Sequence, residues 1–275
     1  MTGHLRHPLT YLQPPARPTG TPDRRALSVY YGPNALNVLC RYRRVIVQPG
    51  HYRVDAVRWL QARGVQVLAY LSLGMDSSPH GDWLRGAPDP HWHLRPVDAR
   101  HPEWRARIEA QVLAQRAVFN GFLLDTLDSA SDPVQVRAML KLVRQVRQWA
   151  GPCYLMANRG FGLLPRLGGT INGVLIEALS TTWADGYRMY ERHELEYTAA
   201  LVAQARRLHL EVYGLDYAVT TRARRFALRR AEALGVPTFV SNRELTLPGG
   251  LLPRLAAPER HAHGSLSSTD RKSVV

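Results

Sequence analysis

Two acidic residues of this chain directly follow short apolar runs. Asp125 comes after Phe122-Leu123-Leu124, and Glu177 comes after Val174-Leu175-Ile176. A carboxylate at the end of a buried strand is costly unless it is hydrogen-bonded, paired or functional. Two such groups could hydrolyse a glycosidic bond, because one protonates the leaving oxygen while the other attacks the anomeric carbon or activates water. Asp125 and Glu177 are therefore candidate catalytic residues, and a helix cap or a buried salt bridge is the alternative for each.

Other polar and aromatic side chains fall at or just after the ends of further apolar runs. Aromatic rings beside a few polar groups are typical of a small-molecule site, and sugars can stack their C–H faces on such rings. Simple packing is the alternative for each ring. The candidate substrate-binding residues are Tyr31, Tyr70, Ser72, Asp76, Asp128, Asn158, Trp183, Asp216 and Tyr217.

The elements that must position these side chains alternate along the chain. The predicted strands are Leu27–Tyr31, Val45–Gln48, Val65–Leu73, Gly121–Asp125, Tyr154–Ala157, Gly173–Glu177, Glu211–Leu215 and Pro237–Val240. The predicted helices are Tyr52–Arg63, Pro102–Phe119, Asp132–Ala150, Gly162–Leu167, Arg192–Leu208 and Thr221–Leu234. Eight strands mostly separated by helices indicate an α/β fold in which a parallel sheet closes into a single (β/α)₈ TIM barrel. An open doubly wound sheet is the alternative, and it would need fewer strands.

The length of 275 residues suits one such barrel, which typically has about 250 residues. Residues 1–25 are rich in Pro, Thr and Arg, and we expect them to form a disordered arm. We expect the barrel to cover residues 26–250 and a flexible tail to cover 251–275. Active sites of these barrels lie at the carboxyl ends of the strands, where the candidate residues would meet.

The net charge of +14 comes almost entirely from arginine. A basic excess can indicate nucleic-acid binding, with a contiguous basic groove. Here the arginines are spread over many segments, and the densest group, between Arg222 and Arg230, falls on a predicted outer helix. We therefore expect no nucleic-acid partner, and keep a basic nucleic-acid-binding protein as a less favoured alternative.

The long segment Gly74–Arg100 contains residue types that bind metals, including Asp76, His80, Asp82, His91 and His93. This spacing has no regular scaffold, so a lid or sugar-contact loop is favoured over a zinc site, and we expect no metal. The chain has neither a G-x-G-x-x-G turn nor a G-x-x-x-x-G-K-[ST] loop, so no cofactor is expected.

Six segments together resemble a known family. They are Tyr30-Tyr31-Gly32, Ala69–Gly74, Gly121–Asp128, Asn172–Leu179, Leu215–Ala218 and Gly235–Ser241. In order and spacing they are similar to the glycoside hydrolase family 114 type, the endo-α-1,4-polygalactosaminidases, over roughly residues 27–245.

The resemblance implies a (β/α)₈ barrel that cleaves galactosamine-containing exopolysaccharide with retention. It implies that Asp125 is the nucleophile and Glu177 the general acid/base, and it places Asp128, Asp216 and Tyr217 along the substrate cleft. The family carries an acid straight after the Ser-x-Gly of its third strand. Here Met75 holds that position, and the nearest acid is Asp76.

The expected partner is a polysaccharide or oligosaccharide of the galactosamine or N-acetylgalactosamine type, bound by a monomer. We see no signal peptide and no apolar run long enough to cross a membrane, so the chain as written is expected in the cytoplasm, or outside the cell if the start site is misassigned. A catalytically inactive carbohydrate-binding barrel is the alternative, and it would keep the aromatic residues but misplace one acid.

Overall fold

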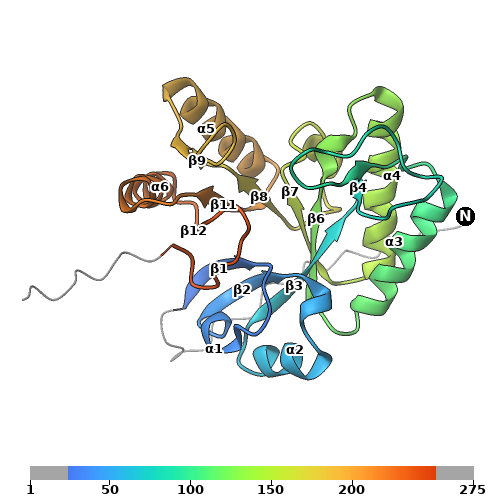
Figure 1. Cartoon of the computed structure of the whole chain (residues 1–275), viewed down its shortest axis with the longest axis horizontal. Coiled ribbons are helices and arrows are strands. Elements are labelled where there is room, and N and C mark those ends of the chain that lie inside the picture. Colours follow the sequence, from blue (N-terminus) through green and yellow to red (C-terminus); the bar gives the residue numbers. More distant parts are fainter. Residues whose placement is uncertain (1–23, 252–275) are drawn as a thin grey trace, which may run out of the picture.

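The computed structural model describes residues 24–251. Eight parallel strands form one sheet in the order β1-β2-β3-β6-β7-β8-β11-β12 (Figure 1). Their bounds are β1 Arg25–Tyr30, β2 Tyr42–Val47, β3 Gln66–Ser72, β6 Gly121–Asp125, β7 Tyr154–Asn158, β8 Gly173–Glu177, β11 Glu211–Tyr217 and β12 Thr238–Ser241. The prediction of an eight-stranded α/β barrel is confirmed. The predicted arm and tail lie almost entirely outside the described residues, and β1 begins at Arg25.

Helices surround the strands, as Figure 1 shows in a view along the barrel. They are α1 Leu36–Leu39, α2 Val54–Gln61, α3 Pro102–Gln115, α4 Pro133–Ala150, α5 Arg192–Arg207 and α6 Thr221–Leu234. The described chain also contains three 3₁₀ turns, which are η1 Pro49–His51, η2 Leu127–Ser129 and η3 Leu164–Arg166. The predicted helix over Gly162–Leu167 is therefore wrong: only the single turn η3 connects β7 to β8.

Local signals in the sequence set several helix ends. The Asp132 carboxylate accepts hydrogen bonds from the N–H groups of Val134 and Gln135, and so caps the start of α4. Helix α6 ends at Gly235, whose φ of 60° is left-handed and favours glycine. The apolar strands suit burial on both faces, and Val45, Ile46 and Val47 of β2 are all fully buried.

The barrel is nearly closed. Strands β1 and β12 are not hydrogen-bonded to each other within the described chain, and the segment after β12 fills the seam between them. The Leu245 carbonyl accepts a hydrogen bond from the Tyr31 N–H at 2.9 Å, while the Leu251 N–H donates to the Val240 carbonyl at 2.7 Å. The Ser28 hydroxyl donates to a second carbonyl of this segment, that of Pro248. We call residues 242–251 the closing segment.

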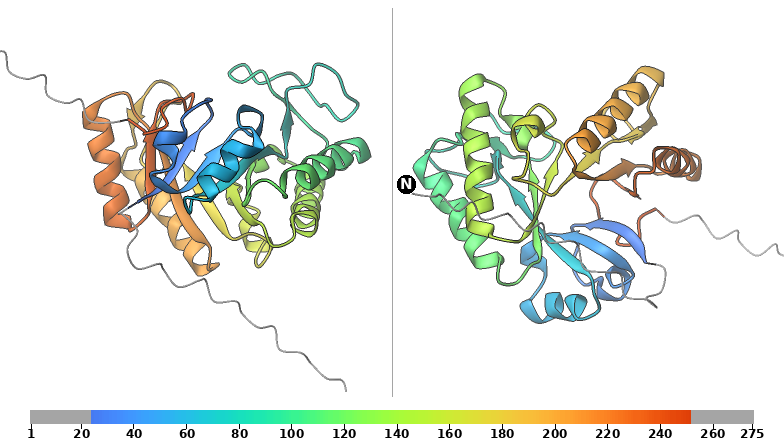
Figure 2. Two further views of the ribbon diagram at one scale, coloured as in Figure 1. Left: turned by 90° about the horizontal axis from the view of Figure 1, so that it is seen from below. Right: turned by 180° about the vertical axis from the view of Figure 1, so that it is seen from behind.

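Two short antiparallel hairpins stand beyond the carboxyl ends of the strands, and the sequence patterns did not predict them. One pairs β4 Met75–Asp76 with β5 Arg95–Pro96 inside the long segment that follows β3. Figure 2 shows this teal segment projecting beyond the barrel. The other pairs β9 Thr181–Thr182 with β10 Arg188–Met189, just after β8. No helix among residues 24–251 is long and apolar enough to span a membrane.

Candidate active site

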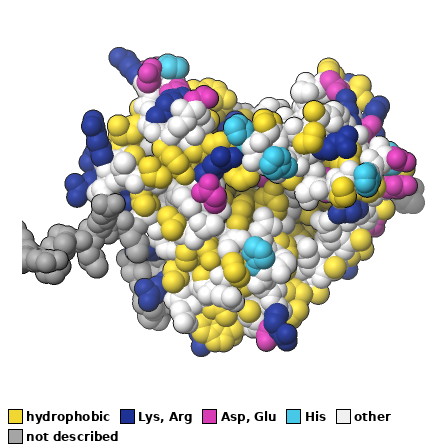
Figure 3. Space-filling view, viewed as in Figure 1, with side chains coloured by type: hydrophobic (Ala, Val, Ile, Leu, Met, Phe, Trp, Pro, Cys, Tyr) yellow, Lys and Arg dark blue, Asp and Glu magenta, His cyan; other side chains and the backbone are white. Residues whose placement is uncertain are grey.

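A cavity of about 800 Å³ opens at the carboxyl ends of the strands. Its walls come from five strands of the barrel, from helix α3 and from segments that follow strands, among them those after β2, β3 and β12. Figure 3, seen in the same direction as Figure 1, shows a hollow near the middle of this face with Lys and Arg side chains dispersed around it. A volume of this size lies in the range of small-molecule sites and can hold several sugar units.

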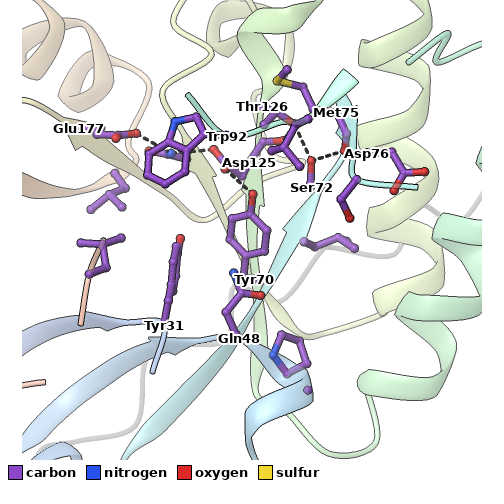
Figure 4. A pocket seen from close by; sticks show the side chains of 18 of the residues that line it. Tyr31, Gln48, Tyr70, Ser72, Met75, Asp76, Trp92, Asp125, Thr126 and Glu177 are labelled. Carbon is purple, nitrogen blue, oxygen red and sulfur yellow. Dashed lines mark hydrogen bonds between the residues drawn. The ribbon is translucent and has the colours of Figure 1, made fainter. Parts of the chain in front are cut away.

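Asp125 and Glu177 both line this cavity, and one side chain joins them. The Nδ2 group of Asn158, at the end of β7, donates to Asp125 Oδ1 at 2.7 Å and to Glu177 Oε2 at 2.9 Å. Strand β7 lies between β6 and β8 in the sheet, so the amide comes from the one strand that neighbours both acids. Figure 4 shows the two carboxyl groups pointing toward one another.

This shared donor limits the separation of the two acids. The two protons of an amide nitrogen diverge by about 120°, so the two oxygens that accept them lie about 5 Å apart. The orientation of the amide is fixed chemically as well, because reversing it would turn its oxygen toward two carboxyl groups. The two reactive groups are thus held at a set distance by a third.

Each acid also accepts a hydrogen bond from its own tyrosine. Tyr70 of β3 donates to Asp125 Oδ2 at 2.7 Å, and Tyr217 of β11 donates to Glu177 Oε1 at 2.5 Å. The Tyr31 ring packs edge-on against Tyr70, with the ring centroids 5.2 Å apart. Burial raises the pKa of Tyr31, Tyr70 and Tyr217, and the nearby carboxylates raise it further. All three phenols therefore remain protonated, and Tyr70 and Tyr217 remain donors to the two acids.

The electrostatic environment favours the protonated form of Glu177. Burial raises its pKa most, and the charge of Asp125 raises it further. The hydrogen bonds from Tyr217 and Asn158 and the charge of Arg159 oppose this shift. A carboxyl that keeps its proton toward neutral pH can act as a general acid.

Two other predicted residues also reach the cavity. Ser72 lines the wall, but its hydroxyl donates to the Met75 carbonyl at 2.6 Å and so stabilises the turn after β3. Asp76 lines the cavity too, and its carboxylate accepts a hydrogen bond from the Trp83 indole at 2.9 Å. Arg107 lies 3.9 Å from the other Asp76 oxygen.

The structure does not bring Asp216 to the cavity. Side chains alternate along a strand, and the neighbours Leu215 and Tyr217 face the cavity, so Asp216 points to the outside of the barrel. There its buried carboxylate accepts hydrogen bonds from the N–H groups of Ser180 and Thr181 and from the Ser180 hydroxyl. Burial raises the pKa of Asp216, and these bonds oppose the rise. Asp216 therefore stabilises the loop that follows β8.

Asp128 and Trp183 also lie outside the cavity lining. Asp128 is exposed on η2 and forms an ion pair with Arg159 at 3.0 Å. Trp183 lies on the hairpin loop after β9, where Trp92 packs edge-on against it at 5.8 Å between ring centroids. The predictions of direct substrate contacts by Asp128, Trp183 and Asp216 thus find no support in their positions.

Several lining residues escaped prediction. Trp92 comes from the long segment after β3, and Arg243 and Glu244 come from the closing segment. These segments have no periodicity, so only the tryptophan itself, within a segment expected to contact sugars, was a sequence signal. Gln48 and Met75 line the cavity as well.

The cavity is acidic although the protein is basic. Asp76, Asp125, Glu177 and Glu244 line it, and Arg243 is the one lysine or arginine among its described lining residues. Such a cleft favours cationic groups more than the net charge of +14 suggests. Among the described residues, no group of three or more His, Cys, Asp or Glu side chains could hold a metal ion.

No family model matches the sequence, and no curated protein matches it. Among solved structures, the fold matches the glycoside hydrolase domain of PelA from Pseudomonas aeruginosa, with a TM-score of 0.74 and 25% identity over 80% of this chain and 96% of that domain. The chain is a structural relative of this glycoside hydrolase. The match confirms the resemblance to the family 114 type.

Two other structures share the fold at lower identity. Ega3 from Aspergillus fumigatus, solved in complex with galactosamine, matches with a TM-score of 0.64 and 14% identity, over 82% of this chain and 93% of Ega3. An α-galactosidase from Thermus thermophilus matches with a TM-score of 0.54 and 14% identity, over 85% of this chain and 60% of that enzyme.

The inactive-barrel alternative expected one misplaced acid. Both acids lie in the cavity and share one hydrogen-bond donor, so this alternative has no support in the site. Helix α6, with Arg222 to Arg230, lies on the outside of the barrel (Figure 1), away from the cavity lining.

Proposed function

We propose that this protein is a glycoside hydrolase that cleaves α-linked galactosamine- or N-acetylgalactosamine-containing polysaccharide with retention. The observation that carries this proposal is the Asn158 amide, whose nitrogen donates to one oxygen of Asp125 and one oxygen of Glu177, a geometry that puts these two oxygens about 5 Å apart. Retaining glycosidases separate their carboxyl groups by about 5–5.5 Å, and inverting enzymes by about 6.5–9.5 Å to admit a water molecule.

The roles follow from the surroundings of each acid. Glu177 has a raised pKa and so supplies the proton to the leaving oxygen. Asp125 attacks the anomeric carbon and forms a glycosyl-enzyme intermediate. Glu177, now ionised, then takes a proton from the water that hydrolyses this intermediate.

The substrate class rests on the charge of the cavity and on the relatives. An acidic cleft on a basic protein suits a polymer with free amino groups, and the cleft has the size for several sugars. The PelA domain is a glycoside hydrolase, and Ega3 was solved with galactosamine.

Substitutions of the two acids test the proposal. Asp125→Asn and Glu177→Gln are each expected to lower cleavage of α-1,4-linked galactosamine and N-acetylgalactosamine oligosaccharides by about 10²-fold or more, measured by mass spectrometry of the products. Asp128→Asn is the matched control, because this exposed acid lies three residues after the end of β6 but outside the cavity lining. Full activity in either of the first two variants would contradict the assignment.

The stereochemistry has a separate test. In a retaining enzyme, azide can replace the missing carboxylate of a Glu177→Ala variant and attack the intermediate, which gives a glycosyl azide of the same anomeric form as the substrate. Azide added to an Asp125→Ala variant attacks the substrate itself and gives the opposite anomer. NMR of the products distinguishes the two, and loss of this pattern would exclude the retaining mechanism.

A further inference from the structure

Arg243 lines the cavity and has no charged partner among residues 24–251. No carboxylate of the described chain lies within ion-pair distance of its guanidinium group. Its one hydrogen bond within the described residues runs from Nη2 to the His91 carbonyl, at 3.3 Å. The Nε group is buried, and no residue in the described part of the chain accepts a hydrogen bond from it. A guanidinium group has five N–H donors, so most of the hydrogen-bonding capacity of this side chain is unused.

Two tryptophans fix the guanidinium in place. Its central carbon lies 4.6 Å from the ring centroid of Trp92 and 4.2 Å from that of Trp183. The Arg243 backbone N–H also donates to the Tyr187 hydroxyl at 2.8 Å. Three segments, which follow β3, β8 and β12, thus hold one arginine in a preorganised position, and cation–π contacts of this kind are strongest where water is excluded.

The position of Trp92 relates this cluster to the reacting groups. Trp92 lines the same cavity as Asp125 and Glu177, and in the view of Figure 4 its ring projects between the two acids. A sugar chain that fills this cavity therefore meets both the catalytic pair and the wall formed by Trp92 and Arg243, which we call the roof of the cleft. The other charged groups among the described lining residues are acidic and favour cationic groups of a ligand. Arg243 instead favours neutral or anionic hydrogen-bond acceptors in its part of the cleft.

We propose that Arg243 is a specificity-determining residue that binds the acetamido carbonyl of an N-acetylated sugar next to the catalytic pair. This inference rests on the proposed function. An acetamido group is neutral and offers a carbonyl oxygen, whereas the ammonium group of a deacetylated sugar is repelled by the fixed cation. The acidic remainder of the cleft accepts free amines, so the preferred substrate is a partly acetylated polymer with an N-acetylated unit under Arg243.

The test compares two α-1,4-linked hexasaccharides, one of galactosamine and one of N-acetylgalactosamine. Arg243→Met removes the charge and the donors but keeps a long apolar stem. It is expected to lower kcat/KM on the acetylated hexasaccharide at least about tenfold, chiefly through KM, with a clearly smaller loss on the deacetylated one. Equal losses on the two substrates, or none, would overturn the inference, since equal losses are the result of a displaced Trp92 alone.

A matched control removes the same kind of stacking elsewhere. Arg63 lies 3.6 Å from the centroid of Trp59, donates to the Trp59 carbonyl and is exposed outside the cavity. Arg63→Met is expected to leave both kcat/KM values unchanged. Arg243→Lys keeps the charge but not the planar donors, so only part of the preference for the acetylated substrate should return.

Binding measurements distinguish the role of Arg243 from the proposed hydrolase activity. Titration calorimetry of wild type and Arg243→Met with each hexasaccharide reports the preference without turnover. A wild-type protein that cleaves neither substrate contradicts the proposed function. Selective loss of binding to the acetylated hexasaccharide in Arg243→Met supports the role of Arg243 even then, and unselective binding contradicts it.

Discussion

At the scale of single residues, Asn158 is the side chain on which the site depends. Its nitrogen serves two carboxyl groups, while its Oδ1 atom is buried without a partner among the described residues. A buried acceptor without a partner costs free energy, which the two hydrogen bonds from the nitrogen of the same amide to the carboxyl groups offset. Keeping the two acids close together therefore costs part of the free energy of folding.

The hydrogen bond from Tyr217 to Glu177 should influence how the activity depends on pH. The general acid must be protonated, so kcat/KM falls as the pH rises through the pKa of Glu177, which burial has raised. The Tyr217 hydrogen bond opposes that rise. Tyr217→Phe removes it, so the alkaline limb of the kcat/KM profile should move to higher pH. A limb that stays in place or moves to lower pH would contradict Glu177 as the acid.

The same raised pKa predicts a conflict between stability and function. Ionised Glu177 destabilises the folded state, so stability is lost as the pH rises from the ordinary glutamate pKa through the raised one. Glu177→Gln cannot ionise. Its melting temperature should exceed that of wild type above this window and match it at lower pH. Thermal melts at several pH values test this, and a variant that is less stable at every pH would refute it.

At the scale of elements, Asp216 shows how one strand serves two purposes. Strand β11 directs Tyr217 into the cavity and Asp216 outward, where it binds the chain at the start of β9. The loop that begins there carries Trp183, which stacks on Arg243. The outward face of β11 thus supports the roof of the cleft.

Removal of this carboxylate should destabilise the protein strongly. Asp216→Ala leaves the buried N–H groups of Ser180 and Thr181 without an acceptor, which should cost about 3 kcal/mol or more in the free energy of unfolding. Urea titration measures this value. Asp128→Ala removes only an exposed ion pair and should cost less than about 1 kcal/mol. Comparable losses in the two variants would contradict the role given to Asp216.

Sequence patterns predict the strands better than the segments between them. Strands β6 and β8 match their predicted bounds to the residue, because each is a continuous apolar run bounded by glycine and an acid. The two hairpins have strands of two residues each, too short for any periodicity to show. The turn η3 contains Pro165 and precedes Gly168, which limit a helix that the leucines alone favour.

The candidate site was predictable where strand ends alone decide it. Asp125, Glu177 and Asn158 end three adjacent strands and meet as expected. The strand that contains Asp216 was predicted correctly, but its side chain points to the outside of the barrel and not into the cavity. Because side chains alternate along a strand, the prediction that Tyr217 faces the cavity already implied that its neighbour Asp216 faces outward. The positions of the Trp92 and Arg243 side chains could not be predicted, since they depend on contacts between segments far apart in the sequence.

At the scale of the whole molecule, the seam between β1 and β12 is the weakest part of the barrel. The β1 edge is joined to the closing segment by few backbone hydrogen bonds, whereas β3, β6 and β7 form continuous ladders. Local opening follows the number of such contacts. The amides of Tyr31 and Leu251 should therefore exchange with deuterium faster than those of Leu123 and Leu124 in β6. Equal protection at both places would show that the seam is as stable as the ladders.

The seam also passes through the cleft. Tyr31, on its β1 side, and Arg243 and Glu244, on the closing segment, all line the cavity. An oligosaccharide that contacts both sides would stabilise the junction between β1 and the closing segment. A ligand at about 100 times its Kd stabilises a fold by about 2.7 kcal/mol, and here that gain would be concentrated where the barrel opens first. The barrel would then be most completely closed while it holds the polymer that it cuts.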